Sequence, residues 1–221
     1  MPTLYTTILV TSAGTAIFYG LRIRTPANLT RMVLKAASTA LLSLLAAVHG
    51  TSWLLVAALA FGAGGDAFLA WPGETTFLCG LGSFLIAHLL YIAVFVQIGS
   101  GMDLIVAEGW RRVCAVMVSV LAPAMSLILV RRVGTSLRLP IVIYSTAILF
   151  MVLCSLTTPT QDVVMGALCF AISDTFLAAD EFLVATESRH RTWMQHTVWI
   201  LYYGGQVLLA TGLLQADARS L

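Results

Sequence analysis

Residues 75–98 read TTFLCGLGSFLIAHLLYIAVFVQI, a run of 24 residues that contains no Asp, Glu, Lys or Arg. An α-helix rises 1.5 Å per residue, so this run extends about 36 Å and covers the roughly 30 Å of hydrocarbon in a bilayer. The run is therefore predicted to form a transmembrane helix.

The same pattern recurs along the whole chain. Of the 221 residues, 59% are hydrophobic and only 10% are charged, and the mean hydropathy is +0.94. This composition excludes a soluble globular protein, because lipid must be the solvent for most of the surface. Clusters of Gly, Pro and charged residues separate the long apolar runs. Eight runs are long enough to cross the bilayer: approximately residues 3–21, 30–48, 52–71, 75–98, 111–131, 138–157, 162–183 and 193–214.

The predicted fold class is all-α, a polytopic membrane protein with about eight transmembrane helices in a single domain over residues 1–221. The connecting loops are short, so neighbouring helices must run antiparallel. Residues 3–21 lack a basic segment before the apolar run and an evident cleavage site after it, and we interpret them as a retained span rather than a signal peptide. The four cysteines all lie in apolar runs, with neither a disulfide framework nor a zinc spacing.

Lysine and arginine are unevenly divided between the two sides of the membrane. Short loops that carry positive charge stay in the cytoplasm, so both chain termini are predicted to be non-cytoplasmic. The membrane would be the plasma or inner membrane of a bacterium, or the endoplasmic reticulum of a eukaryote. Nine basic residues follow the odd-numbered spans: Arg22, Arg24, Arg31, Lys35, Arg131, Arg132, Arg138, Arg189 and Arg191. Three lie on the opposite side: Arg111, Arg112 and Arg219.

An offset of 108 residues indicates an internal repeat. It aligns Gly-Asp-Ala-Phe-Leu-Ala at residues 65–70 with Ser-Asp-Thr-Phe-Leu-Ala at residues 173–178. The same offset pairs His88 with His196. We therefore predict two parallel repeats of four helices each, residues 1–108 and 109–221, whose matching sites face each other from the same side of the membrane.

The two aligned aspartates, Asp66 and Asp174, lie inside predicted spans. A carboxylate inside a span is unfavourable by several kcal/mol unless it is paired, hydrated or protonated, so an intramembrane acid indicates function by default. The alternative is a structural pair with a histidine, a hydroxyl or Lys35. Two carboxyl groups that share a site of low dielectric do not both ionise readily, so we expect one to keep its proton. Such a pair suits acid catalysis on acetal-like or enol-ether centres, and it equally suits proton-coupled transport.

Several other residues are candidates for supporting roles. Histidines at positions 88 and 196 are possible proton partners or structural hydrogen-bonding residues. Lys35 could meet a phosphate at the cytoplasmic mouth, or extend to the membrane interface. Asp180 and Glu181 are expected to be solvated. Two aspartates and two histidines could also ligate a metal, but no compact metal-ligand spacing is present, and we expect no metal. The full supporting set is Lys35, His88, Tyr91, His196, Tyr202, Tyr203 and Gln206, of which the phenols and the amide suit a polar head group.

Four motifs occur in order along nearly the whole chain. They are FGAGGDAFL at residues 61–69, GSFLIAHLLY at 82–91, GALCFAISDTFLA at 166–178 and YYGGQ at 202–206. Together they resemble the YhhN family of lysoplasmalogenases, multi-pass membrane hydrolases that cleave the vinyl ether of lysoplasmalogens. The resemblance implies that Asp66 and Asp174 are the active-site acids, and that the lysine early in the second span is Lys35.

The expected function is therefore hydrolysis of a lysophospholipid vinyl ether to a fatty aldehyde and a glycerophospho head group. One aspartate would donate a proton, and the other would stabilise the cation and direct water. We expect no cofactor and no nucleic-acid partner, only lysolipid and the surrounding membrane lipids. The alternatives are a proton-coupled transporter of lipid or small molecules, and a non-catalytic lipid-binding protein.

Overall fold

A computed structural model describes residues 2–220 of the chain. Within this range it consists of helices and the loops between them. The helices are α1 (Pro2–Leu21), α2 (Leu29–Val48), α3 (Trp53–Leu69), α4 (Glu74–Ile98), α5 (Asp103–Ala107), α6 (Gly109–Val130), α7 (Thr135–Ser155), α8 (Gln161–Phe182) and α9 (His190–Ser220). The predicted all-α fold is confirmed.

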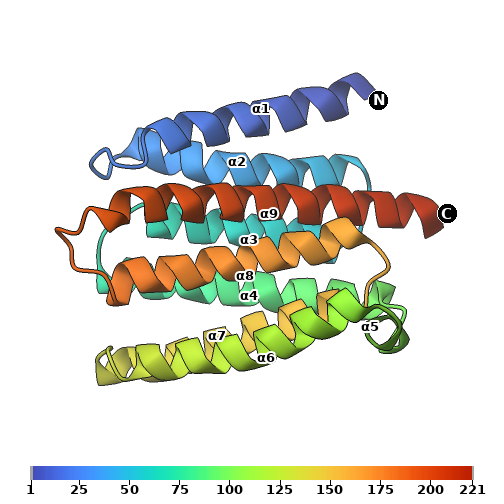
Figure 1. The fold of residues 1–221 in the computed structure, drawn as a ribbon. Coiled ribbons are helices and arrows are strands. Elements are labelled where there is room, and N and C mark those ends of the chain that lie inside the picture. Colours follow the sequence, from blue (N-terminus) through green and yellow to red (C-terminus); the bar gives the residue numbers. More distant parts are fainter. Residues whose placement is uncertain (1, 221) are drawn as a thin grey trace.

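Eight of these helices run the length of the bundle, each antiparallel to the next, and both chain termini lie at the same end (Figure 1). Seven are long and apolar enough to cross a membrane. The remaining predicted span, the third along the chain, corresponds to α3, which is shorter, with 17 residues. The additional helix, α5, has five residues and lies between two predicted spans, in a segment that was expected to be a loop. A polytopic membrane protein is thus the architecture, and the duplication into two halves stays a prediction.

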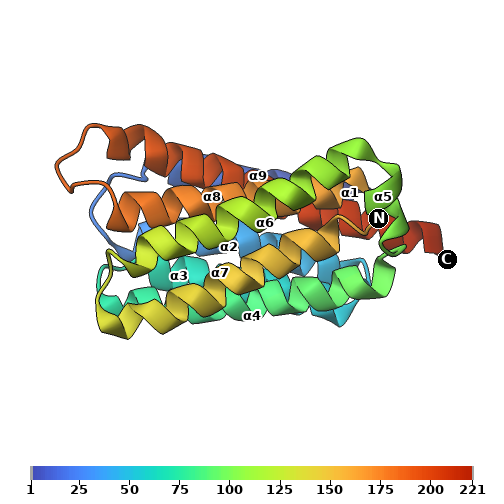
Figure 2. The same ribbon diagram turned by 60° about the horizontal axis from the view of Figure 1, so that its bottom comes forward.

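The helices differ in how much of their surface the protein itself covers. Helix α3 packs against α2 and α4, and α8 packs against α9. Helices α6 and α7 lie side by side on one face of the bundle (Figure 2). Only three residues of α6, Arg111, Ser126 and Leu129, are buried. The remaining surface of α6 is available to lipid, because its exposed side chains are mostly apolar.

An aromatic cluster joins the middle of the bundle. The rings of Phe84 on α4, Phe170 on α8 and Tyr202 on α9 meet edge to face, with centroids 5.3 to 6.0 Å apart. His88 packs against Phe170 with a centroid distance of 4.7 Å. Edge-to-face pairs are favoured at this spacing, so the cluster holds α4, α8 and α9 in a fixed relation next to the two aspartates.

Buried Arg111 closes the bundle at the end that carries the termini. Its Nη1 donates to the carbonyl oxygens of Leu156 and Thr158, both at 2.8 Å, and its Nε donates to Glu108 at 2.9 Å. The hydrogen bond from Arg111 lowers the pKa of Glu108 below its ordinary value. Although Arg111 was counted as a basic residue of this side of the membrane, its guanidinium binds the carbonyls of Leu156, the C-cap residue of α7, and of Thr158 in the loop that follows.

Two glycines allow α8 and α9 to approach closely. A Cβ atom added at Gly205 would lie 2.9 Å from the carbonyl oxygen of Gly166, whereas one added at Gly204 would meet nothing within 4 Å. Small residues at such crossings let helix backbones pack against each other in a membrane.

We therefore expect opposite results from alanine at these adjacent positions. Gly205→Ala should lower the free energy of unfolding by about 1 kcal/mol, because overpacking against a backbone outweighs the better helix propensity of alanine. Gly204→Ala should leave it unchanged or raise it by up to about 1 kcal/mol. Thermal unfolding of both purified variants in detergent measures the difference, and equal melting temperatures would contradict the close approach.

Candidate active site

A cavity of about 950 Å³ lies at the end of the bundle opposite the termini. Its walls come from the loops that follow α1, α3 and α8, and from the adjoining ends of the helices. Both Asp66 and Asp174 line it. Their side chains are 1% and 10% exposed, respectively. The structure therefore brings the two aspartates to one shared cavity.

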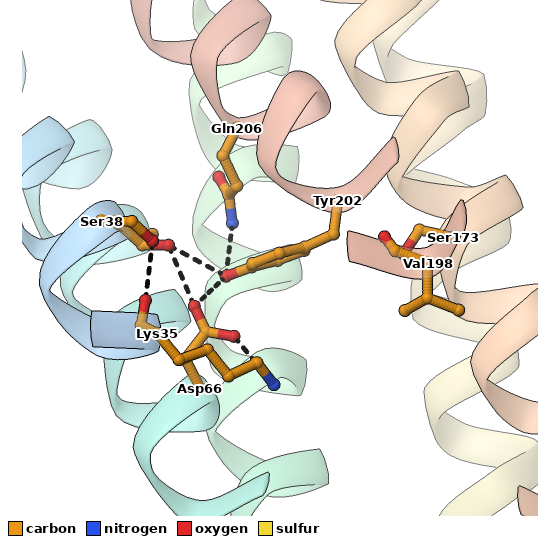
Figure 3. Close-up of polar contacts among 8 residues, drawn as sticks. Lys35, Ser38, Asp66, Ser173, Val198, Tyr202 and Gln206 are labelled. Carbon is orange, nitrogen blue, oxygen red and sulfur yellow. Dashed lines mark hydrogen bonds and ion pairs between the residues drawn. The ribbon is translucent and has the colours of Figure 1, made fainter. Parts of the chain in front are cut away.

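Asp66, near the end of α3, is surrounded by donors from two other helices (Figure 3). Lys35 on α2 places its Nζ 3.4 Å from Oδ1. Thr39, one turn further along α2, donates to Oδ2 at 2.9 Å, and Tyr202 on α9 donates to the same oxygen at 2.7 Å. An ammonium group and two hydroxyl donors at this buried position would stabilise a negative charge on the carboxylate.

Three of the predicted supporting residues form a chain of hydrogen bonds behind Asp66. Tyr91 donates to Oε1 of Gln206 at 2.6 Å, and Nε2 of Gln206 donates to the phenol oxygen of Tyr202 at 3.4 Å. Tyr202 lies between Gln206 and Asp66 in Figure 3. All three side chains are buried, and their hydrogen bonds lead to the carboxylate of Asp66, while Tyr202 also lines the cavity.

Asp174 has a different environment. Tyr144 on α7 donates to Oδ2 at 2.6 Å, and Nε2 of His88 on α4 lies 4.0 Å from the same oxygen. Within the described residues, His88 is the basic partner of Asp174, and no Lys or Arg lies within 4 Å of this carboxylate. The preceding residue, Ser173, donates to the carbonyl oxygen of Val198 at 3.0 Å and fixes α8 against α9. The two aspartates thus differ in charge compensation.

Two predicted supporting residues lie away from this constellation. Tyr203 forms a 2.8 Å hydrogen bond with Ser12 on α1, and Nδ1 of His196 lies 2.7 Å from the carbonyl oxygen of Thr192. Neither lines the cavity within the described part of the chain. The Tyr203 contact joins α9 to α1, whereas the His196 contact lies within α9 and does not join two helices.

The expectation for Asp180 was wrong. Its side chain is buried at 4% exposure and accepts hydrogen bonds from Arg191 at 3.1 and 3.3 Å and from Gln195 at 3.2 Å. The loop between α8 and α9 folds back, so this guanidinium covers the carboxylate. Glu181 is half exposed, as expected.

Sequence reasoning missed two hydroxyl donors, Thr39 and Tyr144. Thr39 follows Lys35 by four residues, so helical spacing places both on one face of α2. Tyr144 precedes Asp174 by 30 residues, and Thr39 precedes Asp66 by 27. In each half, the helix before the aspartate supplies a hydroxyl to it. A search for hydroxyls about 30 residues ahead of each aspartate would have found both.

The mouth of the cavity carries charges of both signs. Lys35 pairs with Asp66, so an anion at the mouth would be bound by the other basic residues. The Nε of Arg31 is buried and has no hydrogen-bond partner among the described residues. The charged residues of the mouth are Arg24, Arg31, Asp180, Glu181, Glu187, Arg189 and Arg191.

Fold and site together define a class: a multi-pass helical membrane protein with a paired acidic site in a cavity at one end of the bundle. The YhhN family profile matches residues 30–213, which is most of the sequence. The chain belongs to the YhhN family, and the resemblance drawn from its motifs is confirmed.

Relatives of the chain include two proteins named lysoplasmalogenase. Lysoplasmalogenases of Mycobacterium bovis (strain ATCC BAA-935 / AF2122/97) and Mycobacterium tuberculosis (strain CDC 1551 / Oshkosh) are each 35% identical to this chain over 152 residues. The alignment covers 65% of this chain and 56% of each relative, so the matched region spans little more than half of their length. No solved structure matches the chain.

Proposed function

We propose that this protein hydrolyses the vinyl ether bond of lysoplasmalogens, releasing a fatty aldehyde and a glycerophospho head group. The observation that carries the proposal is the unequal pair in one cavity. Asp66 lies beside an ammonium group, whereas Asp174 lies beside a neutral phenol. Membership of the YhhN family and the likeness to two lysoplasmalogenases support the same substrate class.

The unequal environments suggest a division of roles. Lys35 compensates the negative charge of Asp66, so this carboxylate is the ionised partner. Among the described residues no lysine or arginine lies within 4 Å of Asp174, and a proton neutralises this carboxylate at less cost than burying a bare charge. Asp174 is then the acid and Asp66 the base, a pairing of carboxyl groups that is well suited to oxocarbenium-like transition states.

The reaction balances with these two groups and one water. Asp174 donates its proton to the alkenyl carbon that is not bonded to oxygen, and the adjacent carbon becomes an oxocarbenium ion. Water attacks that carbon while Asp66 accepts a water proton, giving a hemiacetal. The hemiacetal hydroxyl returns a proton to Asp174 as the carbon–oxygen bond to glycerol breaks, and Asp66 protonates the departing glycerol oxygen. The products are an aldehyde and an alcohol, and both aspartates regain their starting states.

The mixed charges at the cavity mouth fit the polar end of such a substrate. Arg31 has an unpartnered Nε at the cavity wall, and guanidinium groups bind phosphate oxygens well. The acidic residues nearby suit a cationic amine on the same head group. A glycerophospho head group that carries an amine would therefore find a partner for its phosphate and a partner for its amine.

Mass spectrometry of products tests the function directly. Purified protein in detergent is incubated with 1-alkenyl, 1-alkyl and 1-acyl lysophospholipids of the same head group and chain length. We expect fatty aldehyde from the alkenyl lipid alone, because only its double bond can accept the proton and form the oxocarbenium ion. In H₂¹⁸O, the glycerol hydroxyl of the released head group should carry no label, since water attacks the alkenyl carbon and the bond from that carbon to the glycerol oxygen breaks.

Absence of aldehyde from an intact, folded protein would refute hydrolysis. Fatty acid from the acyl lipid would instead indicate an esterase. Movement of lysolipid or protons across liposomes without any product would favour the transporter alternative.

A further inference from the structure

A second, smaller cavity lies between α4, α6, α7 and α8, beside the first. We propose that it holds the beginning of the substrate's hydrocarbon chain, so that the site binds a single-chain amphiphile with its polar–apolar boundary at Asp174. The proposal rests on the proposed function and adds where the chain lies. Residues lining this apolar cleft include Ala122, Met125, Tyr144, Ile148, Asp174 and Phe182.

The apolar cleft is continuous with the polar cavity. Asp174 lines both spaces, together with Leu69, Phe77, Phe84 and Leu177. A molecule that occupies both must therefore pass this aspartate. The other acid, Asp66, lines the polar cavity alone and lies away from the apolar cleft.

The walls of the polar cavity and of the apolar cleft differ in chemistry. The polar cavity has five acidic and five basic side chains on its walls, whereas the cleft has one carboxyl group, Asp174, and otherwise aliphatic, aromatic and hydroxyl side chains. Burying each methylene group in such surroundings is favourable by about 0.8 kcal/mol. The cleft offers a polar head group no charged partners apart from Asp174. An amphiphile that occupies both spaces therefore places its head group in the polar cavity and its chain in the cleft.

The cleft holds only part of a chain. Its volume is about 80 Å³, much smaller than the polar cavity. Thr175 lines it and is also exposed on the outer surface of α8. Packing between α6 and α8 is sparse compared with that between α8 and α9. The chain thus continues from the cleft between these helices toward the bilayer, and no long internal tunnel is needed.

This placement explains the division of roles between the aspartates. In an alkenyl lysolipid the vinyl ether is the first bond of the chain, directly at the boundary with the glycerol head. The carbon that receives the proton lies on the chain side, next to Asp174. The carbon attacked by water lies on the head side, toward the polar cavity and Asp66. The same boundary holds for alkyl lysolipids, which should bind without reacting and inhibit competitively.

Photo-crosslinking tests the cleft without relying on hydrolysis. The probe is a 1-alkyl lysophosphoethanolamine, which lacks the reactive double bond, with a diazirine a few carbons from the ether. We expect crosslinks in the wild-type protein at cleft residues such as Met125, Ile148 and Phe182. Competition by unlabelled alkyl lysolipid should remove these crosslinks, because they report one saturable site.

A matched pair of variants on α6 sharpens the test. Ala122 lines the cleft, whereas Ala124 is exposed on the same helix and lies outside it. Ala122→Trp should reduce the specific crosslinks and raise the KM for alkenyl lysolipid roughly tenfold, as expected when about two methylene groups lose apolar contact. Ala124→Trp should leave both unchanged.

Crosslinks that fall on lipid-facing residues, without competition, would overturn the proposal even if the Ala122 variant failed to fold. An unchanged KM and crosslinking pattern in folded Ala122→Trp would also overturn it. Specific cleft crosslinks in a protein that releases no aldehyde would uphold the chain site and refute the proposed hydrolysis instead.

Discussion

Asp174→Asn is expected to lower the rate of aldehyde release about a thousandfold, because the amide has no acidic proton to give to the alkenyl carbon. The substitution keeps the size of the side chain, and the carbonyl oxygen of Asn can still accept the hydrogen bond from Tyr144. We therefore expect unchanged thermal unfolding and unchanged binding of alkyl lysolipid. Initial rates of aldehyde formation, measured at saturating alkenyl lysolipid, give the effect on kcat.

Comparison with two other acids makes the result specific. Asp66→Asn should lower kcat by roughly 100- to 1,000-fold, since the oxocarbenium ion loses its nearby negative charge and water loses its base. Asp103→Asn, at the exposed start of α5, should retain wild-type rates. Full activity in either the Asp66 or the Asp174 variant would exclude the two-carboxyl mechanism.

Lys35→Met is expected to lower the free energy of unfolding by about 3 kcal/mol, because it leaves the carboxylate of Asp66 buried without a counter-charge. In a chain of this length, that loss corresponds to a fall in melting temperature of roughly 6 to 12 °C. The rate of aldehyde release should also drop about a hundredfold, since the carboxylate would take up a proton and no longer serve as base. Thermal unfolding in detergent and product assays measure the two effects.

The double variant Lys35→Met with Asp66→Asn separates charge from shape. Removing both members of a buried pair is often nearly neutral, whereas removing one is strongly destabilising. We expect the double variant to unfold within about 1 kcal/mol of wild type, while its activity stays as low as that of Asp66→Asn. If Lys35→Met alone melts like wild type, and the double variant brings no recovery, the ion pair does not hold the charge of Asp66.

The candidate acids could be found from the sequence because intramembrane charge is rare. Asp66 and Asp174 stand out in apolar runs, and the repeated Phe-Leu-Ala tail ties them together. Their separate partners could not be found in this way. His88 was matched with His196 by the offset, yet it lies near Asp174, while His196 contacts the backbone of its own helix. The rotation of each helix about its axis decides such contacts, and hydropathy does not encode it.

The same distinction explains the error at Asp180. A carboxylate next to Glu181 at the end of a span is usually solvated, and no pattern in the sequence indicated that Asp180 would be buried. The loop after α8 returns so that Arg191 and Gln195 cover this side chain. Loop paths depend on many weak contacts, and one residue of register decides whether a guanidinium reaches its partner.

The amino-acid sequence by itself determined that this protein is a polytopic helical membrane protein of the YhhN family, with two acids inside its spans. Length and hydrophobicity suffice for the helical membrane fold, because a bilayer demands apolar helices of fixed length whatever their neighbours are. The four motifs indicated the family. Only the tertiary structure decided that both acids line one cavity, that Lys35 compensates one of them, and that the other borders an apolar cleft. Those relations join helices far apart in the chain, and packing of side chains between helices, rather than local composition, fixes them.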